Sequence, residues 1–137
     1  GCACTMNSIL KQFTKHLTVG ENEVVLLDME AGVEHFGRGV DNSVDLILMI
    51  VDPSFESLEL TKKIQQLGES IGKTVFFVLN KVNGQILPTM LESIDDQSKV
   101  LAVISEDTEI ARKGLLGNEL MMEIPEIHTL ARKILKQ

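Results

Sequence analysis

The chain has 137 residues, of which 44% are hydrophobic and 24% are charged, and its formal net charge is -7. We expect a single globular domain over residues 1–137, long enough to bury a core. The acidic balance, with basic residues scattered along the chain, argues against binding to nucleic acid. The longest apolar run, 46–51, is far shorter than the roughly 20 residues that cross a bilayer, so we expect no membrane partner.

Two cysteines, Cys2 and Cys4, stand at the start of the sequence. They are too close together for an ordinary intrachain disulfide, and the sequence has no pattern of a charged and then apolar secretory leader. These features favour a reducing cytoplasm as the location. Because the sequence begins with Gly1 rather than Met, we expect it to be part of a larger protein.

The first expected element is an amphipathic helix that Thr5 caps and that ends at Gly20. Its apolar residues recur at helical spacing, at positions 6, 9, 10, 13 and 17. The segment 23–28 follows as a strand buried on both faces. A loop over 29–44 comes next, with glycines at 32, 37 and 39.

Three further apolar runs predict strands at 45–52, 74–80 and 99–104. Helices are expected between and after them: one capped by Ser54 or Ser57 and closed by Gly72, one over 86–94, and two more over 106–112 and 125–136. Four apolar strands separated by helices indicate an α/β fold, in which a parallel sheet carries helices on both faces.

Polar residues end the four expected strands: Asp28, Asp52, Asn80 and Ser105. Open parallel sheets bind ligands at this edge. Asp28 can orient Mg2+, usually through water, and the backbone amide of Gly32 can meet a terminal phosphate. The plainer interpretation of Asp28 is a loop cap. The phosphate loop G-x-x-x-x-G-K-[ST] occurs nowhere in the chain.

Asn80 and Lys81 end a strand where a nucleotide base should lie. An Asn amide can both donate to adenine and accept from it. Proteins that bind guanine through the pattern N-K-x-D need a carboxylate at the fourth place, where this chain has Asn83. Adenine is therefore favoured as the base. The alternative is that Asn80 only satisfies a turn.

The string D-M-E-A-G-V-E-H-F-G-R-G at 28–39 resembles the switch segment of the deviant-Walker ATPases, which include MinD and ParA proteins and the nitrogenase iron protein. It is most similar to the CooC type, the accessory ATPases of carbon monoxide dehydrogenase that are implicated in nickel insertion. The Cys2-x-Cys4 pair, V-D-P-S at 51–54 and L-N-K at 79–81 extend this resemblance over the chain.

The resemblance implies a P-loop NTPase-like fold of which this chain is the C-terminal portion, without the N-terminal phosphate-loop unit. The strand of that unit would run between the strand that ends at Asp28 and the strand that ends at Asp52. ATP and Mg2+ are then the ligands of the intact parent, held in part by Asp28, Gly32, Asn80 and Lys81. The chain alone is expected to be inactive, since the groups that position and stabilise the phosphates are absent from it.

The resemblance also implies a homodimer in which Cys2 and Cys4 of both subunits bind Ni2+ or Zn2+. The implied partner is a nickel enzyme such as carbon monoxide dehydrogenase. Two inert thiols are the plainer interpretation of the cysteines. A different function on the same fold is a nucleotide-dependent positioning or partner-binding module of the MinD and ParA kind, although those relatives generally lack the cysteine pair.

Overall fold

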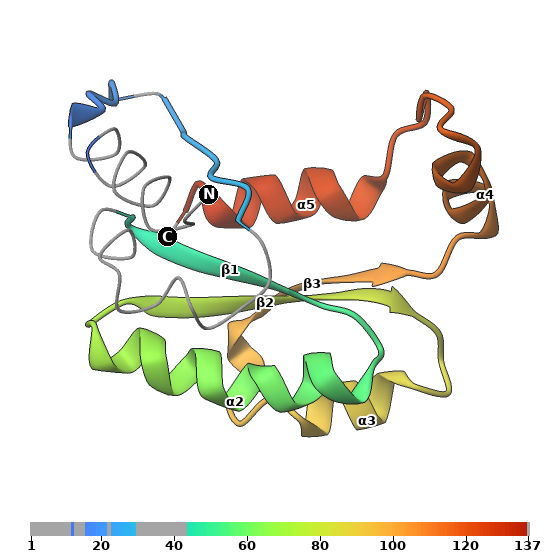
Figure 1. The fold of residues 1–137 in the computed structure, drawn as a ribbon, viewed down its shortest axis with the longest axis horizontal. Coiled ribbons are helices and arrows are strands. Elements are labelled where there is room, and N and C mark those ends of the chain that lie inside the picture. Colours follow the sequence, from blue (N-terminus) through green and yellow to red (C-terminus); the bar gives the residue numbers. More distant parts are fainter. Residues whose placement is uncertain (1–11, 13–15, 22, 30–43, 137) are drawn as a thin grey trace, which may run out of the picture.

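The computed structural model describes residues 12, 16–21, 23–29 and 44–136. This part of the chain forms a parallel sheet with strand order β1-β2-β3, made of Leu46–Val51, Thr74–Val82 and Val100–Ser105. Helices α2 (Phe55–Ser70) and α3 (Leu87–Glu92) lie on one face and α5 (Pro125–Ile134) lies on the other (Figure 1). The 3-10 helix η3 (Gln97–Lys99) precedes β3, and α4 (Thr108–Leu116) follows it. The expected α/β fold, with helices on both faces of a parallel sheet, is confirmed.

Local hydrogen bonds and backbone geometry explain where α2 begins and ends. Ser54 is its cap, because Ser54 Oγ accepts from the N–H of Ser57 at 3.2 Å. After the helix, Gly72 has a φ of 68°, a left-handed conformation that costs glycine little because it has no Cβ. The chain can therefore turn directly from α2 into β2.

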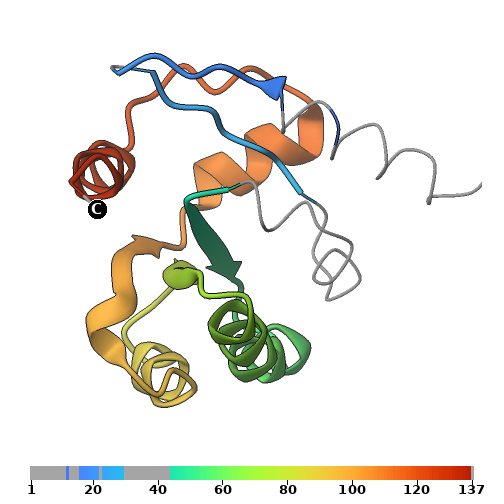
Figure 2. The ribbon, with the colours of Figure 1, turned by 90° about the vertical axis from the view of Figure 1, so that its left-hand side faces the viewer.

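Two hydrophobic cores lie on opposite faces of β2. In the turned view, α2 and α3 lie on one side of the sheet and α5 lies on the other (Figure 2). Val75, Phe77 and Leu79 are buried on the side of α2 and α3. On the other side, Val78 packs with Leu130 of α5. Alternate residues of one strand thus serve different cores, as expected for a central strand that is buried on both faces.

The prediction of a strand at 23–28 is wrong, because residues 23–29 have no regular secondary structure. Val24, Val25 and Leu26 are 56%, 45% and 82% exposed rather than buried. An apolar segment becomes a strand only where another strand pairs with its backbone. Among the described residues, no strand lies along the edge of β1 that faces away from β2.

The segments on either side of 23–29 are described only in small part. Gln12 and His16 are helical, and the rest of the expected first helix lies outside the described residues. The same holds for most of the expected loop over 29–44. The expectations for these two segments stay predictions.

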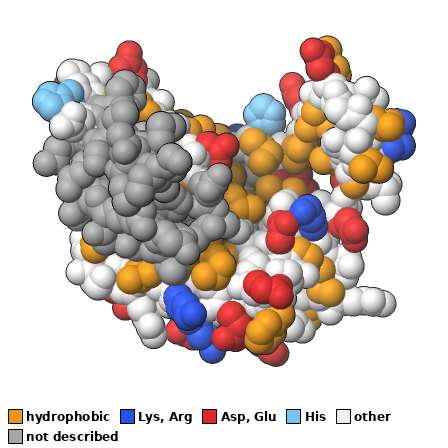
Figure 3. Space-filling model, in the orientation of Figure 1, with side chains coloured by type: hydrophobic (Ala, Val, Ile, Leu, Met, Phe, Trp, Pro, Cys, Tyr) orange, Lys and Arg blue, Asp and Glu red, His pale blue; other side chains and the backbone are white. Residues whose placement is uncertain are grey.

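Helix α4 stands away from the sheet (Figure 1). None of its residues is buried, and Leu115 and Leu116 are 87% and 59% exposed. Figure 3 shows hydrophobic side chains on the lobe that contains α4 and in the hollow beside it. Despite these exposed side chains, the part of the chain that the structure describes has no helix long and apolar enough to cross a membrane.

Candidate functional site

The carboxyl edge of the sheet brings Asp52, Asn80 and Lys81 together. Asp52 follows β1, and it comes close to the end of β2 because Val51 pairs in register with Leu79. The Nδ2 atom of Asn80 donates to Asp52 Oδ1 at 2.9 Å. Lys81 Nζ donates to Asp52 Oδ2 at 2.6 Å and forms an ion pair with it. Each carboxylate oxygen of Asp52 thus has its own donor.

A bulge in β2 creates this arrangement. Leu79 pairs with Val103 and Val82 pairs with Ser105, so β2 has one residue more than β3 between the two pairs. Lys81 has a φ of 54°, in the left-handed region that residues with a Cβ rarely adopt. The extra residue returns Val82 to the core that Leu79 occupies. It also lets two consecutive side chains of β2 reach the same carboxylate.

The first turn of α2 holds the backbone of Asp52. The N–H of Asp52 donates to Ser57 Oγ at 3.1 Å, and the carbonyl of Asp52 accepts from the N–H of Ser54 at 2.8 Å. Both serines lie at the start of α2. The position of the carboxylate is therefore set by β1, β2 and α2 together.

Lys81 also controls the charge of Asp52. Its hydrogen bond is the main reason why the pKa of the Asp52 carboxyl lies below the ordinary value, and the Asn80 hydrogen bond and the Lys81 charge add to this effect. Partial burial opposes them by penalising the charged form. Asp52 is therefore ionised at neutral pH, and its carboxylate can only accept hydrogen bonds.

Asn83, at the fourth place of the N-K-x-N sequence, is engaged in a turn. Its Oδ1 atom accepts from the N–H groups of Gln85 and Ile86 at 3.0 and 3.2 Å. These bonds start the chain reversal into α3. The side-chain oxygen of Asn83 thus has a structural role, unlike the Oδ1 atom of Asn80, which accepts from no described residue.

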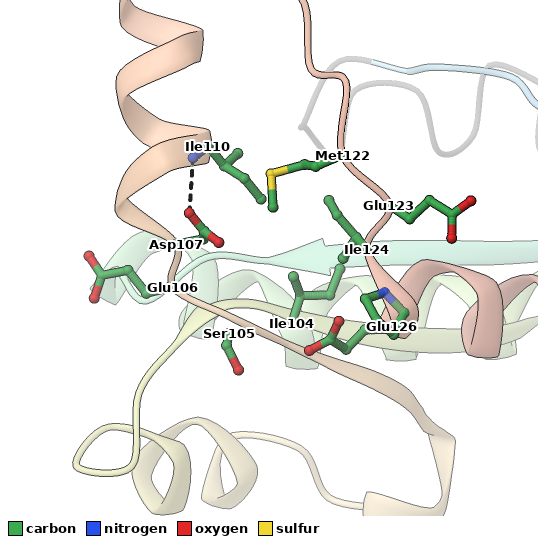
Figure 4. Close-up of a pocket in the computed structure, with 10 residues that line it drawn as sticks. Ile104, Ser105, Glu106, Asp107, Ile110, Met122, Glu123, Ile124 and Glu126 are labelled. Atoms are coloured by element: carbon green, nitrogen blue, oxygen red, sulfur yellow. Dashed lines mark hydrogen bonds between the residues drawn. The ribbon is translucent and has the colours of Figure 1, made fainter.

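A hollow of about 240 Å³ opens at the end of β3, between the starts of α4 and α5 (Figure 4). It adjoins the end of β2, because the N–H of Glu106 donates to the carbonyl of Val82 at 2.9 Å. Its lining combines isoleucines with acidic side chains: Ile104, Ile110, Ile124, Glu106, Asp107, Glu123 and Glu126. Asp107 caps α4 with its side chain. Because carboxylates repel phosphate groups, this hollow suits an uncharged ring better than a phosphate.

The structure unites two of the expected site residues, Asn80 and Lys81, and adds Asp52 as their partner. Asp28 is exposed and lies outside the sheet, and no hydrogen bond or ion pair joins it to another described residue. Gly32, Cys2 and Cys4 lie outside the described residues. In the ranges that are described, no group of three or more His, Cys, Asp or Glu side chains could hold a metal ion.

Sequence reasoning placed Asp52 at a strand end but did not pair it with Asn80 and Lys81. A signal was present, because both segments end consecutive strands of a parallel sheet, and such ends lie at one edge. The three-stranded parallel sheet with helices on both faces is an α/β fold consistent with a P-loop NTPase-like domain.

No protein-family model matches the chain. It is 45% identical over 136 residues to an uncharacterized ATP-binding protein of Methanocaldococcus jannaschii. The aligned segment covers 99% of this chain and 54% of that protein. A second uncharacterized ATP-binding protein of the same organism is 32% identical over 90% of this chain and 49% of its own length. The carbon monoxide dehydrogenase accessory protein CooC of Rhodospirillum rubrum is 33% identical over 85% of this chain and 45% of its own length.

The chain thus has ATP-binding homologues over nearly its whole length and is CooC-like in sequence. It spans about half the length of these relatives. Its identity to CooC is close to its identity to the second archaeal protein, so the comparisons support an ATP-binding, CooC-like group rather than CooC in particular.

Proposed function

We propose that this chain is the base-binding part of an ATP-dependent accessory protein that assists nickel insertion into a metalloenzyme such as carbon monoxide dehydrogenase. The observation that carries the proposal is the cluster of Asp52, Asn80 and Lys81 at the carboxyl edge of a parallel sheet. The ATP-binding homologues supply the class of ligand, and CooC among them suggests the metal pathway.

In this proposal the adenine ring lies beside Asn80 at the ends of β2 and β3. The Oδ1 atom of Asn80 has no partner among the described residues and is available to accept a hydrogen bond from the base. The neighbouring hollow offers an apolar wall that suits a flat ring. Lys81 forms an ion pair with Asp52 and so stabilises the contact between the ends of β1 and β2.

The phosphates are proposed to be bound by a part of the parent protein that this chain does not include. That part would add a strand along the free edge of β1 and give the segment 23–28 a partner, as the resemblance implies. Coverage of only about half of each relative is in keeping with this idea. Asp28 and Gly32 would then lie beside the phosphates, where a single exposed carboxylate fits Mg2+ held through water.

The metal role is assigned to Cys2 and Cys4. Thiolates from two subunits of a homodimer would give four soft ligands, which suit Zn2+ and can compete for Ni2+. Nickel is here the cargo of the protein. Hydrolysis of ATP in the parent would open and close the dimer and so release the ion to the enzyme that needs it.

The base-binding role is tested by titrating ATP into the full-length protein that contains this sequence. Asn80→Ala is expected to weaken ATP binding about tenfold, because the hydrogen bond to the base is lost. Asn118→Ala, which truncates an exposed Asn far from β2 in sequence, is the matched control and should leave the affinity unchanged. Equal affinities of Asn80→Ala and the wild type for ATP would show that adenine does not bind at this edge of the sheet.

The metal role needs a separate measurement. Equilibrium binding of Ni2+ and Zn2+ is compared between the wild type and the double variant Cys2→Ser with Cys4→Ser. We expect the double variant to lose the tight intersubunit site, and unchanged affinities would refute the metal role. For the chain of 137 residues by itself, we expect no release of phosphate from ATP above background.

A further inference from the structure

We infer that Asp52 is a positioning residue that fixes the amide of Asn80 with its carbonyl oxygen toward the nucleotide base, and that this orientation selects adenine over guanine. The inference rests on the proposed function, because it needs Asn80 to face the base. It adds a residue and a mechanism of specificity that the resemblance does not provide.

The contact between Asp52 and Asn80 allows only one orientation of the Asn80 amide. An ionised carboxylate has no proton to donate, so only the amide nitrogen of Asn80 can face it. The distance of 2.9 Å from Asn80 Nδ2 to Asp52 Oδ1 agrees with this assignment. Rotating the amide by half a turn would set two oxygens against each other, which is unfavourable. Asp52 thus determines which end of the Asn80 amide, the nitrogen or the oxygen, faces it.

Two further contacts keep Asp52 from turning away from Asn80. Its other oxygen, Oδ2, is bound by Lys81 Nζ at 2.6 Å, and its backbone N–H donates to Ser57 Oγ at 3.1 Å. A rotation of the carboxylate that released Asn80 would also disturb the ion pair. The bulge at Lys81 therefore serves the orientation of Asn80 through their shared acceptor.

The Oδ1 acceptor of Asn80 distinguishes adenine from guanine. With Nδ2 turned toward Asp52, the Oδ1 atom on the other branch of the amide is left as an acceptor. Adenine carries an amino group at the six position, which donates, whereas guanine carries a carbonyl oxygen there, which accepts. An acceptor in a fixed position forms a hydrogen bond with the amino group of adenine and repels the carbonyl oxygen of guanine. Sites that leave a polar group unpaired reject the wrong ligand strongly.

The test compares the affinities of ATP and GTP in the full-length protein by calorimetric titration. Asp52→Asn keeps the size of the side chain but can present either an amide nitrogen or an oxygen to Asn80, so Asn80 can turn over. We expect the preference for ATP over GTP to fall about tenfold, the value of one well-made hydrogen bond. Asp95→Asn, the same change at an exposed residue, should leave the preference unchanged.

A double variant provides a rescue. When Asp52→Asn is combined with Asn80→Asp, the new amide at position 52 can donate to the new carboxylate at position 80, which still offers an oxygen to the base. We expect the preference for ATP to return toward that of the wild type. A purely structural role of Asp52 would not produce this recovery, and folding of each variant is checked by its thermal unfolding temperature.

The outcomes separate the two proposals. If Asn80→Ala reduces the preference for ATP but Asp52→Asn does not, Asn80 faces the base and the positioning role of Asp52 is refuted. If neither variant changes the preference, the base does not lie at this edge and the proposed function fails as well. A fall with Asp52→Asn and its recovery in the double variant support the inference.

Discussion

Gly68 on α2 and Val75 on β2 are packed so closely that position 68 has no room for a side chain. A Cβ atom there would overlap with Cγ2 of Val75 and would lie 3.1 Å from the carbonyl oxygen of Lys73. Gly68 is also buried in the last turns of α2. This contact sets how closely the helix approaches the sheet where the chain turns back into β2.

We expect Gly68→Ala to destabilise the chain. Alanine is favoured over glycine inside a helix by about 1 kcal/mol, but overpacking against a stiff Val side chain costs about 1–3 kcal/mol. Because the overlap with Val75 is severe, it should dominate, with a net loss of up to about 2 kcal/mol in the free energy of unfolding. Urea denaturation at neutral pH measures it.

Gly114 on α4 provides the matched control, because a Cβ built there meets no atom within 4 Å. In Gly114→Ala only the gain in helix propensity remains, so we expect α4 to be stabilised by about 0.5–1 kcal/mol. Opposite signs for the two substitutions would confirm that contact with Val75 decides the first. A stabilising Gly68→Ala would mean that α2 can move away from β2 at little cost.

Lys81 combines a strained backbone with a favourable ion pair, and two substitutions separate these effects. Lys81→Ala loses the ion pair but keeps the left-handed φ of 54°. Lys81→Gly loses the same ion pair but relieves the Cβ clash, worth about 1 kcal/mol. We therefore expect the glycine variant to be the more stable of the two by about 1 kcal/mol in urea denaturation. The reverse order would show that the bulge holds no backbone strain at this position.

Much of the fold could be predicted from the pattern of apolar residues. The runs at 45–52, 74–80 and 99–104 became β1, β2 and β3, because continuous apolar segments bounded by turns suit a parallel sheet covered on both faces. Ser54 and Gly72 marked the ends of α2 through well-understood capping chemistry. The prediction of a strand at 23–28 was wrong because the composition of this segment does not reveal whether a partner strand is present.

The position of the candidate site at the carboxyl edge of the sheet could be predicted, but the contacts between its side chains could not. Asn80 and Lys81 were expected at the carboxyl edge of the sheet, and the structure puts them there with Asp52 as their partner. The bulge that brings Lys81 to Asp52 depends on a left-handed residue, and no glycine or asparagine at position 81 indicated it. Register between strands is set by packing of both faces, which a single sequence does not reveal.

Thr61 is the one buried polar side chain of the described residues, and it joins α2 to the end of α3. Its Oγ1 atom lies 2.7 Å from the carbonyl oxygen of Leu58 and 3.0 Å from that of Ser93. Thr61→Val keeps the shape but removes the donor, so the Ser93 carbonyl loses its hydrogen bond. We expect a loss of about 1–2 kcal/mol in the free energy of unfolding. Thr61→Ser, which keeps the hydroxyl, separates this effect from the loss of a methyl group.

Asp52 should make the stability of the chain depend on acid pH. Because its folded pKa is lowered chiefly by the hydrogen bond from Lys81, its contribution is complete above the ordinary pKa of an Asp, about 3.9, and is lost as the pH falls through the lower folded value. The Asp52 side chain is 42% exposed, so screening limits this contribution to at most about 1 kcal/mol.

The measurement is urea denaturation of the wild type and Asp52→Asn from pH 7 down to pH 2.5. We expect the wild type to be the more stable of the two at neutral pH and the difference to shrink below about pH 4, because a protonated Asp52 loses its ion pair with Lys81. Asp95→Asn corrects for the change in net charge. A difference that stayed constant or grew as the pH fell would contradict the ion pair, since neither behaviour follows from a carboxyl whose charged form is stabilised by folding.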